Sequence, residues 1–315
     1  MIKWALIANK HAGTRSSKKF WEKMDIIFSN EGLAVEYFFT EKVGHARELA
    51  MDIVKKGYKK VAVMGGDGTF SEVIDGLMKS NVDISEVSVG LIPFGTGNDW
   101  GRYWGLDRNI EKSVKILAEG TPTLVDVGLI KYNAGERNIT RYFINAYGLG
   151  FDAKVLELTN RMQHIFKGAS WTYTLALFMT LFVNRSQVME YDFGQEKFKG
   201  LSYTASIGNG CFTGGGIKQT PEARVDDGVF DVMIVENLNL VKILKAVKLL
   251  FTGRLLEHDS VHLYRTNKMT IKSEKPILSE VDGIFQEKTQ CIEVELIPQK
   301  IKFITPNSSL LTPHS

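Results

Sequence analysis

Up to Asp126, short apolar runs alternate with segments in which apolar residues recur at helical spacing. The apolar runs predict strands at residues 2–9, 34–39, 61–64 and 88–92. The segments between them predict helices at residues 17–30, 46–56, 70–78 and 110–119. The run 61–64 is apolar without interruption, which is typical of a strand buried on both faces of a parallel sheet. This alternation predicts the α/β class, with a doubly wound sheet.

After Asp126 strands predominate, and Gly, Asn and Asp turns separate them. We expect strands at residues 141–147, 187–192, 203–208, 229–235, 261–264, 268–272 and 291–297. Helical insertions interrupt them at residues 154–183 and 240–251. The pattern predicts two domains, an N-terminal α/β domain over residues 1–127 and a C-terminal β-sandwich-like domain over residues 128–299. Residues 300–315 are expected to pack back on the first domain.

Length and composition agree with this picture. With 315 residues the chain is long enough for two domains, because a single core rarely grows past roughly 250 residues. A hydrophobic fraction of 44% and a charged fraction of 24% describe a well-packed globular protein and exclude a disordered or fibrous one. The net charge of +3 is too small to indicate a nucleic-acid partner.

The cysteines and the apolar segments indicate the compartment. The two cysteines, Cys211 and Cys291, are too few for a disulfide framework, and their spacing is not that of metal ligands. This cysteine usage favours a reducing cytoplasm. The N-terminal residues predict a first strand and not a signal peptide. The longest apolar stretch, Trp171–Val183, is well short of the ~20 residues that span a bilayer. We therefore expect a cytoplasmic protein that crosses no membrane.

The segment 64–69, Met-Gly-Gly-Asp-Gly-Thr, lies where a buried strand gives way to a helix. Its glycines allow a sharp turn and let a phosphate approach the backbone closely. The helix that follows would offer unpaired N–H groups and a partial positive charge to an anion. The sequence is neither a Walker A motif nor GxGxxG. Taken alone, it fits a plain strand-to-helix turn as well as a phosphate site.

A second turn repeats this arrangement after the next strand, where the segment 91–99 reads Leu-Ile-Pro-Phe-Gly-Thr-Gly-Asn-Asp. Loops at the carboxyl ends of neighbouring strands line one crevice in an α/β sheet. Both turns would then supply backbone donors and a carboxylate, Asp67 and Asp99, to the same ligand. Carboxylates beside a polyphosphate require a divalent cation between them, and Mg²⁺ is the usual one. The pair of turns therefore favours nucleotide binding.

These turns, with Glu72 close behind the first and Arg102 after the second, resemble the diacylglycerol kinase catalytic-domain family. That family includes the bacterial soluble diacylglycerol kinases, and its relatives are the sphingosine and ceramide kinases. Other segments match it in order over nearly the whole chain: Thr40 with 44–46, 124–128, Asn145 with 148–152, 167–173, 214–216 before Pro221, and 226–231. Each segment alone is weak, but the ordered set is highly specific.

The resemblance implies a kinase that transfers the γ-phosphate of ATP to a lipid hydroxyl, with diacylglycerol as the default substrate. It implies an N-terminal nucleotide domain, a C-terminal lipid-binding domain and an active site between them. By position, it assigns nucleotide binding to Asn9, Lys10, Thr40, Gly65, Gly66, Asp67, Gly68, Thr69, Glu72, Thr96 and Asn98. It assigns catalytic carboxylates to Asp67, Asp99, Asp126 and Asp282, with the first two organising Mg²⁺.

The resemblance also implies a structural Mg²⁺ site. Its ligands would be the Asp227 carboxylate and the main-chain carbonyls of Arg224 and Val229. The alternative for Asp227 is an ordinary Asp-Gly turn.

Two departures from the family pattern stand out. The family has Asn-Pro after its first strand, where this chain has Asn9-Lys10, and Lys10 would reach a phosphate. The family also carries Asp-Gly-Glu near its C-terminus, with the glutamate as general base, where this chain has Asp282-Gly283-Ile284. On a straight strand Glu280 would lie ~13 Å from position 284, and only a bend at Gly283 would narrow that gap, which argues against a simple replacement. Asp67 is another candidate for the general base that accepts the proton of the lipid hydroxyl.

The lipid side of the reaction is indicated by two helical segments. Trp171–Met179 is apolar on nearly every face, as in a core helix or the wall of a lipid cleft. Leu240–Arg254 is amphipathic, and its lysines at 242, 245 and 248 fit a solvated face or docking on an anionic inner-membrane surface at ~1 kcal/mol per charge. An edge strand of the second domain would allow a homodimer.

Two other functions compete with the lipid kinase. Loss of the glutamate at position 284 would suit a non-catalytic nucleotide- or lipid-binding pseudokinase. A kinase of a soluble metabolite such as NAD is the third hypothesis. NAD kinases and phosphofructokinases share the first glycine turn, but we expect their second domains to differ from this one.

Overall fold

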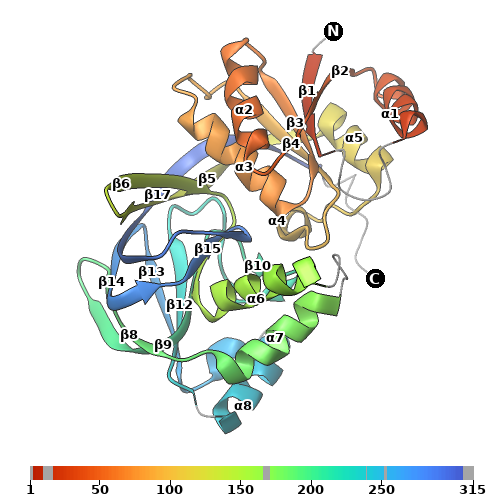
Figure 1. Ribbon diagram of the computed structural model, residues 1–315. Helices are drawn as coiled ribbons and strands as arrows, with labels where there is room; N and C mark the ends of the chain where they lie inside the picture. The colour runs from red at the N-terminus through yellow and green to blue at the C-terminus, as the bar shows by residue number, and fades with distance from the viewer. Residues whose placement is uncertain (1–2, 10–16, 166–170, 239, 252–253, 308–315) are drawn as a thin grey trace. The chain divides into compact units, whose positions relative to one another are not determined.

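The structure is a computed structural model that describes residues 3–9, 17–165, 171–238, 240–251 and 254–307. The chain forms two compact units (Figure 1). The first contains residues 1–127 and 298–315, and the second contains residues 128–297. Among the described helices, none is long and apolar enough to span a bilayer.

Strands and helices alternate through the first unit. Its elements are β1 (Lys3–Ala8), α1 (Lys18–Asn30), β2 (Ala34–Phe39), α2 (His45–Lys55), β3 (Lys60–Gly65), α3 (Asp67–Lys79), β4 (Ser88–Pro93), α4 (Asp99–Tyr103) and α5 (Ile110–Glu119). The strands are parallel in the order β2-β1-β3-β4, and β4 is followed by the end of β17 (Thr289–Thr305). Helix α2 packs on α3, and α1 on α5, so helices cover both faces (Figure 1). This is the doubly wound α/β fold that the alternation predicts.

The second unit is rich in antiparallel strands. They are β5 (Thr121–Ala134), β6 (Arg137–Phe143), β7 (Ala146–Gly150), β8 (Gln187–Asp192), β9 (Lys197–Gly208), β10 (Phe212–Thr213), β11 (Ile217–Lys218), β12 (Phe230–Glu236), β13 (Val261–Thr266), β14 (Lys268–Ile277), β15 (Ser279–Val281) and β16 (Ile284–Phe285). The helices of this unit are α6 (Phe151–Ile165), α7 (Trp171–Val183), α8 (Leu240–Phe251) and the 3₁₀ turn η1 (Leu255–Glu257). Strands β5 and β17 each run through both units.

The core of the second unit forms between its strands. Strand β9 pairs with β8 over its first half and with β7 and β12 over its second half, so it joins two groups of strands. Fully buried apolar residues from both groups meet in one cluster, among them Tyr147, Ile207, Ile271 and Val294. The arrangement is the β-sandwich-like packing that the strand-rich pattern predicts.

Several boundaries differ from those expected. The helical insertion expected near 154–183 contains two helices, α6 and α7, and α6 begins three residues earlier, at Phe151. The strand expected at 141–147 is interrupted at Ile144 and Asn145, because the Asp282 carboxylate accepts their N–H groups and removes them from the ladder. Helix α3 begins at Asp67, three residues before the expected Phe70. The short helix α4 was not expected at all.

Candidate active site

The two glycine turns are neighbours in the first unit. Each follows a buried parallel strand, and these strands, β3 and β4, pair so that Gly65 lies opposite Pro93. The N–H of Phe94 donates to the carbonyl of Gly65 at 2.8 Å, which fixes the start of the second turn against the first. Helices α3 and α4 start directly after the turns, at Asp67 and Asp99. Two helix N-termini and two turns therefore meet at one edge of the sheet.

Gly66 and Gly95 allow the turns to approach this closely. A Cβ at Gly66 would lie 2.9 Å from the Cα of Gly95, and a Cβ at Gly95 would lie still nearer the Cα of Gly66. Any side chain at either position would collide with backbone. The sequence signal of two glycine-rich turns thus has a physical cause, the direct contact between the turns.

Asp67 connects the two turns through its side chain. Its Oδ1 accepts the N–H of Trp100, in the first turn of α4, at 3.2 Å. Asp99, next to Trp100 in the chain, is buried, with 6% of its surface exposed. Both carboxylates belong to the first turns of helices that begin beside the glycines. Hard carboxylate oxygens next to backbone donors are a donor set that suits Mg²⁺ with a polyphosphate.

Aromatic residues support the helices behind the turns. Phe70 of α3 stacks on Trp100 of α4 with ring centroids 5.9 Å apart. Phe303, from the last part of β17, contacts both rings edge-on, and its centroid lies 5.4 Å from that of Trp100. All three side chains are almost completely buried. The turns therefore stand on a rigid base.

Other residues that the resemblance assigns to the nucleotide lie in α3 or directly after β1 and β2. Glu72 accepts the N–H of Gly44 at 2.8 Å, and Thr40, whose N–H donates to the carbonyl of Ala8, is buried beside β1. Asn9 directly follows β1, Thr69 packs against Gly65, and Gly68 lies in the first turn of α3. Lys10 lies outside the described residues.

The second turn is closed by its own side chain. The Oδ1 of Asn98 accepts the N–H of Gly95 at 2.8 Å, and its Nδ2 donates to the carbonyl of Gly95 at 3.0 Å. Arg108 donates to the carbonyls of Gly95 at 2.7 Å and of Thr96 at 3.1 Å. Asn98 thus shapes the turn, and its side chain is directed to the backbone. Arg108 could not be predicted from the sequence, because its contact depends on the fold of the loop after α4.

Asp126 is a wholly buried residue of β5. Its Oδ1 accepts the N–H of Gln299 at 2.7 Å. Gln299 has a left-handed backbone with φ of 47°, so this hydrogen bond holds an unusual conformation at the point where β17 enters the first unit. Asp126 thus holds the backbone of β17 at this point, and the catalytic role that the resemblance implies for it stays a prediction.

Asp282 lies in the turn between β15 and β16. Its carboxylate accepts three backbone N–H groups, from Ile144 at 3.1 Å, Asn145 at 3.0 Å and Ala146 at 2.9 Å. Only 7% of the residue is exposed. A carboxylate that holds three buried donors organises the junction of β6 and β7, and its catalytic role stays a prediction.

We predict that Asp282→Ala lowers the free energy of unfolding by about 3–4 kcal/mol, since three buried N–H groups lose a charged acceptor. Asp282→Asn is expected to cost about 1–2 kcal/mol, because one amide oxygen remains as an acceptor. Asparagine also tolerates the left-handed φ of 46° at this position. Urea unfolding of the two variants measures the difference. Equal and small losses in both would contradict the structural role.

The Asp227 carboxylate is already neutralised by a guanidinium. Arg265 pairs with Asp227 through Nη2 and with buried Asp231 through Nε at 2.9 Å. The other Asp227 oxygen accepts the N–H of Val229 at 3.3 Å. Within the described part of the chain, no three His, Cys, Asp or Glu residues are grouped as metal ligands would be. Asp227 is thus paired with a cationic side chain, and the Mg²⁺ site that the resemblance implies at Asp227 and the main-chain carbonyls of Arg224 and Val229 stays a prediction.

The chain reverses direction between Glu280 and position 284. The chain turns at Asp282 and Gly283, which both have positive φ, and β15 and β16 form a hairpin. Val281 then lies opposite Ile284, and Glu280 lies opposite Phe285. The segment therefore bends at Gly283, which was the stated exception to a straight strand. Since cross-strand partners share a face, Glu280 and Ile284 belong to opposite faces of the hairpin.

Comparisons with known proteins agree with this description. Residues 3–130 match the model of the diacylglycerol kinase catalytic domain, and residues 145–305 match that of the YegS C-terminal NAD kinase beta sandwich-like domain. A Staphylococcus saprophyticus protein named diacylglycerol kinase is 29% identical over 303 residues, which cover 96% of this chain and 95% of its own length. A Staphylococcus carnosus protein of the same name is 29% identical over 279 residues, 88% of this chain and 87% of its own.

Solved structures share the fold. The crystal structure of a diacylglycerol kinase from Bacillus anthracis str. Sterne superimposes with a TM-score of 0.71 at 19% identity, covering 98% of both chains. Another structure from the same organism gives a TM-score of 0.79 at 22% identity and covers 98% of this chain and 96% of its own.

Fold, turns and relatives together define a kinase, an enzyme that transfers a phosphoryl group. The chain belongs to the diacylglycerol kinase catalytic-domain family. We had expected the second domain to distinguish this chain from NAD kinases. The description of the matching family likens that domain to the sandwich of NAD kinases, so the domain alone does not separate lipid kinases from NAD kinases.

Proposed function

We propose that this protein is an ATP-dependent lipid kinase that phosphorylates a lipid hydroxyl, with diacylglycerol as its first candidate substrate. The observation that carries the proposal is the pair of touching glycine turns at the ends of β3 and β4, joined by the Asp67 carboxylate. Full-length relatives named diacylglycerol kinase support the choice of substrate. Family membership supports ATP as the phosphate donor.

In the proposed reaction the backbone N–H groups of the two turns hold the phosphates of ATP. Mg²⁺, when bound, neutralises the charge that develops on the transferred phosphoryl group. Asp67 and Asp99 would hold it. The lipid hydroxyl oxygen attacks the γ-phosphorus, its proton passes to a base, and the bond to the β–γ bridging oxygen breaks to release ADP.

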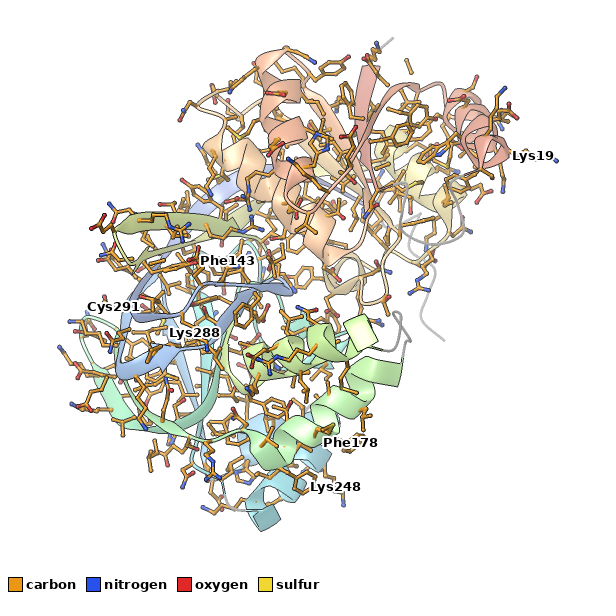
Figure 2. The ribbon with its side chains drawn as sticks, viewed as in Figure 1. Lys19, Phe143, Phe178, Lys248, Lys288 and Cys291 are labelled. Carbon is orange, nitrogen blue, oxygen red and sulfur yellow. The ribbon has the colours of Figure 1, made fainter. Side chains whose placement is uncertain are left out.

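One face of α7 supports a lipid surface as the place of reaction. Five apolar residues at helical spacing are exposed there by 40–68%: Leu175, Phe178, Met179, Phe182 and Val183. Helix α8 packs on α7 through Ile243, which is buried in one cluster with Ala176 and Leu181. The lysines 242, 245 and 248 of α8 are exposed. Figure 2 labels Lys248 on α8 and Phe178 on α7. Apolar side chains beside lysines complement an anionic membrane surface. We infer that this combination docks the enzyme on the inner face of the membrane.

Sedimentation with vesicles containing phosphatidylglycerol tests the docking. The double variant Phe178→Ser/Phe182→Ser is expected to bind at least about tenfold more weakly, since each buried phenyl ring contributes roughly 1.5–3 kcal/mol. Val188→Ser, on β8, removes another exposed apolar side chain and serves as the control. Equal binding by the double variant and the control would overturn this mode of docking.

A panel assay tests the activity itself. Purified protein is incubated with ATP, Mg²⁺ and either diacylglycerol, sphingosine, ceramide or NAD, and product formation is measured. We expect turnover that requires Mg²⁺ and rises with diacylglycerol. Phosphorylation of NAD alone would establish the soluble-metabolite kinase instead. ATP binding without turnover on any acceptor would establish the pseudokinase, for which Ile284→Glu would then restore activity.

A further inference from the structure

Two backbone N–H groups of the second glycine turn have no partner in the described part of the chain. The N–H of Gly95 is used within the turn, where the Oδ1 of Asn98 accepts it at 2.8 Å. The N–H groups of Thr96 and Gly97 make no hydrogen bond to any residue that the structure describes. Successive N–H groups that are open in this way form a concave site for an anion. Thr96 and Gly97 can therefore both donate to a phosphate.

A guanidinium fixes the direction of these two N–H groups. The Nη2 of Arg108 donates to the carbonyl of Gly95 at 2.7 Å and to that of Thr96 at 3.1 Å, so each of its two hydrogens serves one carbonyl. In a planar trans peptide the C=O and the N–H point in opposite directions. The N–H groups of Thr96 and Gly97 belong to the same two peptides, and both are therefore turned away from Arg108.

The loop that carries Arg108 is held at both ends. Before it, the N–H of Leu106 donates to the carbonyl of Gly101 in α4 at 2.8 Å. After it, Asn109 caps α5, since its Oδ1 accepts the N–H of Lys112 at 2.9 Å. The Arg108 side chain is exposed, but the backbone that carries it is anchored between two helices. Little further conformational entropy is lost when this loop presents the guanidinium to the turn.

No carboxylate of the described residues neutralises the charge of Arg108. Its neighbour Asp107 is paired instead with Lys112, at 3.3 Å. A guanidinium keeps its charge throughout the physiological pH range. A charged donor polarises the carbonyl that it binds, which makes the N–H of the same peptide a stronger donor. Arg108 therefore both directs and strengthens the two open N–H groups.

We propose that Arg108 is a positioning residue of the nucleotide site. It keeps the carbonyls of Gly95 and Thr96 turned away from the phosphates of ATP, so that the N–H groups of Thr96 and Gly97 face them. The guanidinium lies on the carbonyl side of the turn and acts through the backbone. The inference deepens the proposed function and rests on its nucleotide site, and every residue concerned belongs to the first unit.

Isothermal titration of the full chain with MgATP and with inorganic tripolyphosphate tests this role. Arg108→Ala is expected to bind both about 10–100-fold more weakly, because the open N–H groups lose the charged group that orients them. Its thermal midpoint should change little, since the side chain is exposed. Free guanidinium at millimolar concentration should restore part of the affinity. Arg137→Ala removes an exposed arginine of β6 that pairs with Glu287, and this control should bind as the wild type does.

The outcomes separate the positioning role from the proposed function. A wild type that binds neither MgATP nor tripolyphosphate overturns the nucleotide site, and with it both proposals. Binding by the wild type, with Arg108→Ala within threefold of it, overturns the positioning role alone. A loss of affinity for MgATP but not for tripolyphosphate also overturns it, because the phosphate donors would then be intact.

An effect on folding is distinguished by two further measurements. A loss of affinity that guanidinium does not restore, together with a lowered thermal midpoint, would show that Arg108 only stabilises the loop and would overturn the positioning role. If Arg108→Ala does not fold, Arg108→Lys decides, because its shorter side chain keeps the charge but not the planar fork. Affinity of Arg108→Lys within threefold of the wild type would then contradict the proposal.

Discussion

Asp67→Asn is expected to lower phosphoryl transfer at least about 10³-fold, since one of the two carboxylates that would hold Mg²⁺ loses its charge. The amide oxygen still accepts the N–H of Trp100, so the contact between the turns should persist. ATP binding should therefore weaken by less than about tenfold, because the backbone donors remain. Steady-state kinetics and isothermal titration with ATP measure the two quantities separately.

Asp83→Asn is the matched control for Asp67→Asn. Asp83 is a carboxylate of the loop before β4, where it accepts the N–H of Ser85 at 2.9 Å. Its loss should leave kcat unchanged. If Asp67→Asn keeps more than a tenth of the wild-type kcat, Asp67 does not organise the transferred phosphate.

Gly95→Ala should weaken ATP binding and slow the reaction, because it changes the contact between the two turns. Its Cβ would collide with the backbone of Gly66, so the two turns must move apart by a substantial part of an ångström. Misplacement on this scale costs about 10²-fold in rate, and we expect a similar loss of ATP affinity. Fluorescence titration with a nucleotide analogue and kcat/KM for ATP measure both effects.

Gly135→Ala controls for the general cost of adding a methyl group. Gly135 has a positive φ of 62° in the β5–β6 hairpin, and a Cβ there would meet nothing within 4 Å. This variant should lose about 1 kcal/mol of stability and keep its full ATP affinity. Unchanged ATP binding in Gly95→Ala would show that the turns do not form the phosphate site.

Local signals in the sequence were sufficient for much of the fold. The apolar period predicted α5 at residues 110–119 and β8 at residues 187–192 with the bounds that the structure has. The glycine turns could be predicted because both the chain reversal and the close approach at Gly66 and Gly95 demand glycine.

Features that depend on distant residues could not be predicted in this way. The break between β6 and β7 is set by Asp282, more than 130 residues further along the chain. The convergence of Glu280 and Asp152 at Gly148 requires the register of β7 with β15, which no local pattern contains. The hairpin at Asp282-Gly283 was different, because Asp-Gly between apolar residues is a known hairpin signal, and a bend at Gly283 was already considered from the sequence.

The course of β17 has a consequence for the order in which the protein can fold during synthesis. Phe303 is made after the whole second unit, yet it belongs to the first unit, where its ring packs on Phe70 and Trp100 beneath both glycine turns. Until it emerges from the ribosome, β4 lacks its outer neighbour and remains an open sheet edge. The proposed nucleotide site lies mostly in the early part of the chain but is thus among the last parts to be completed, so we expect ATP binding only after the second unit has been synthesised.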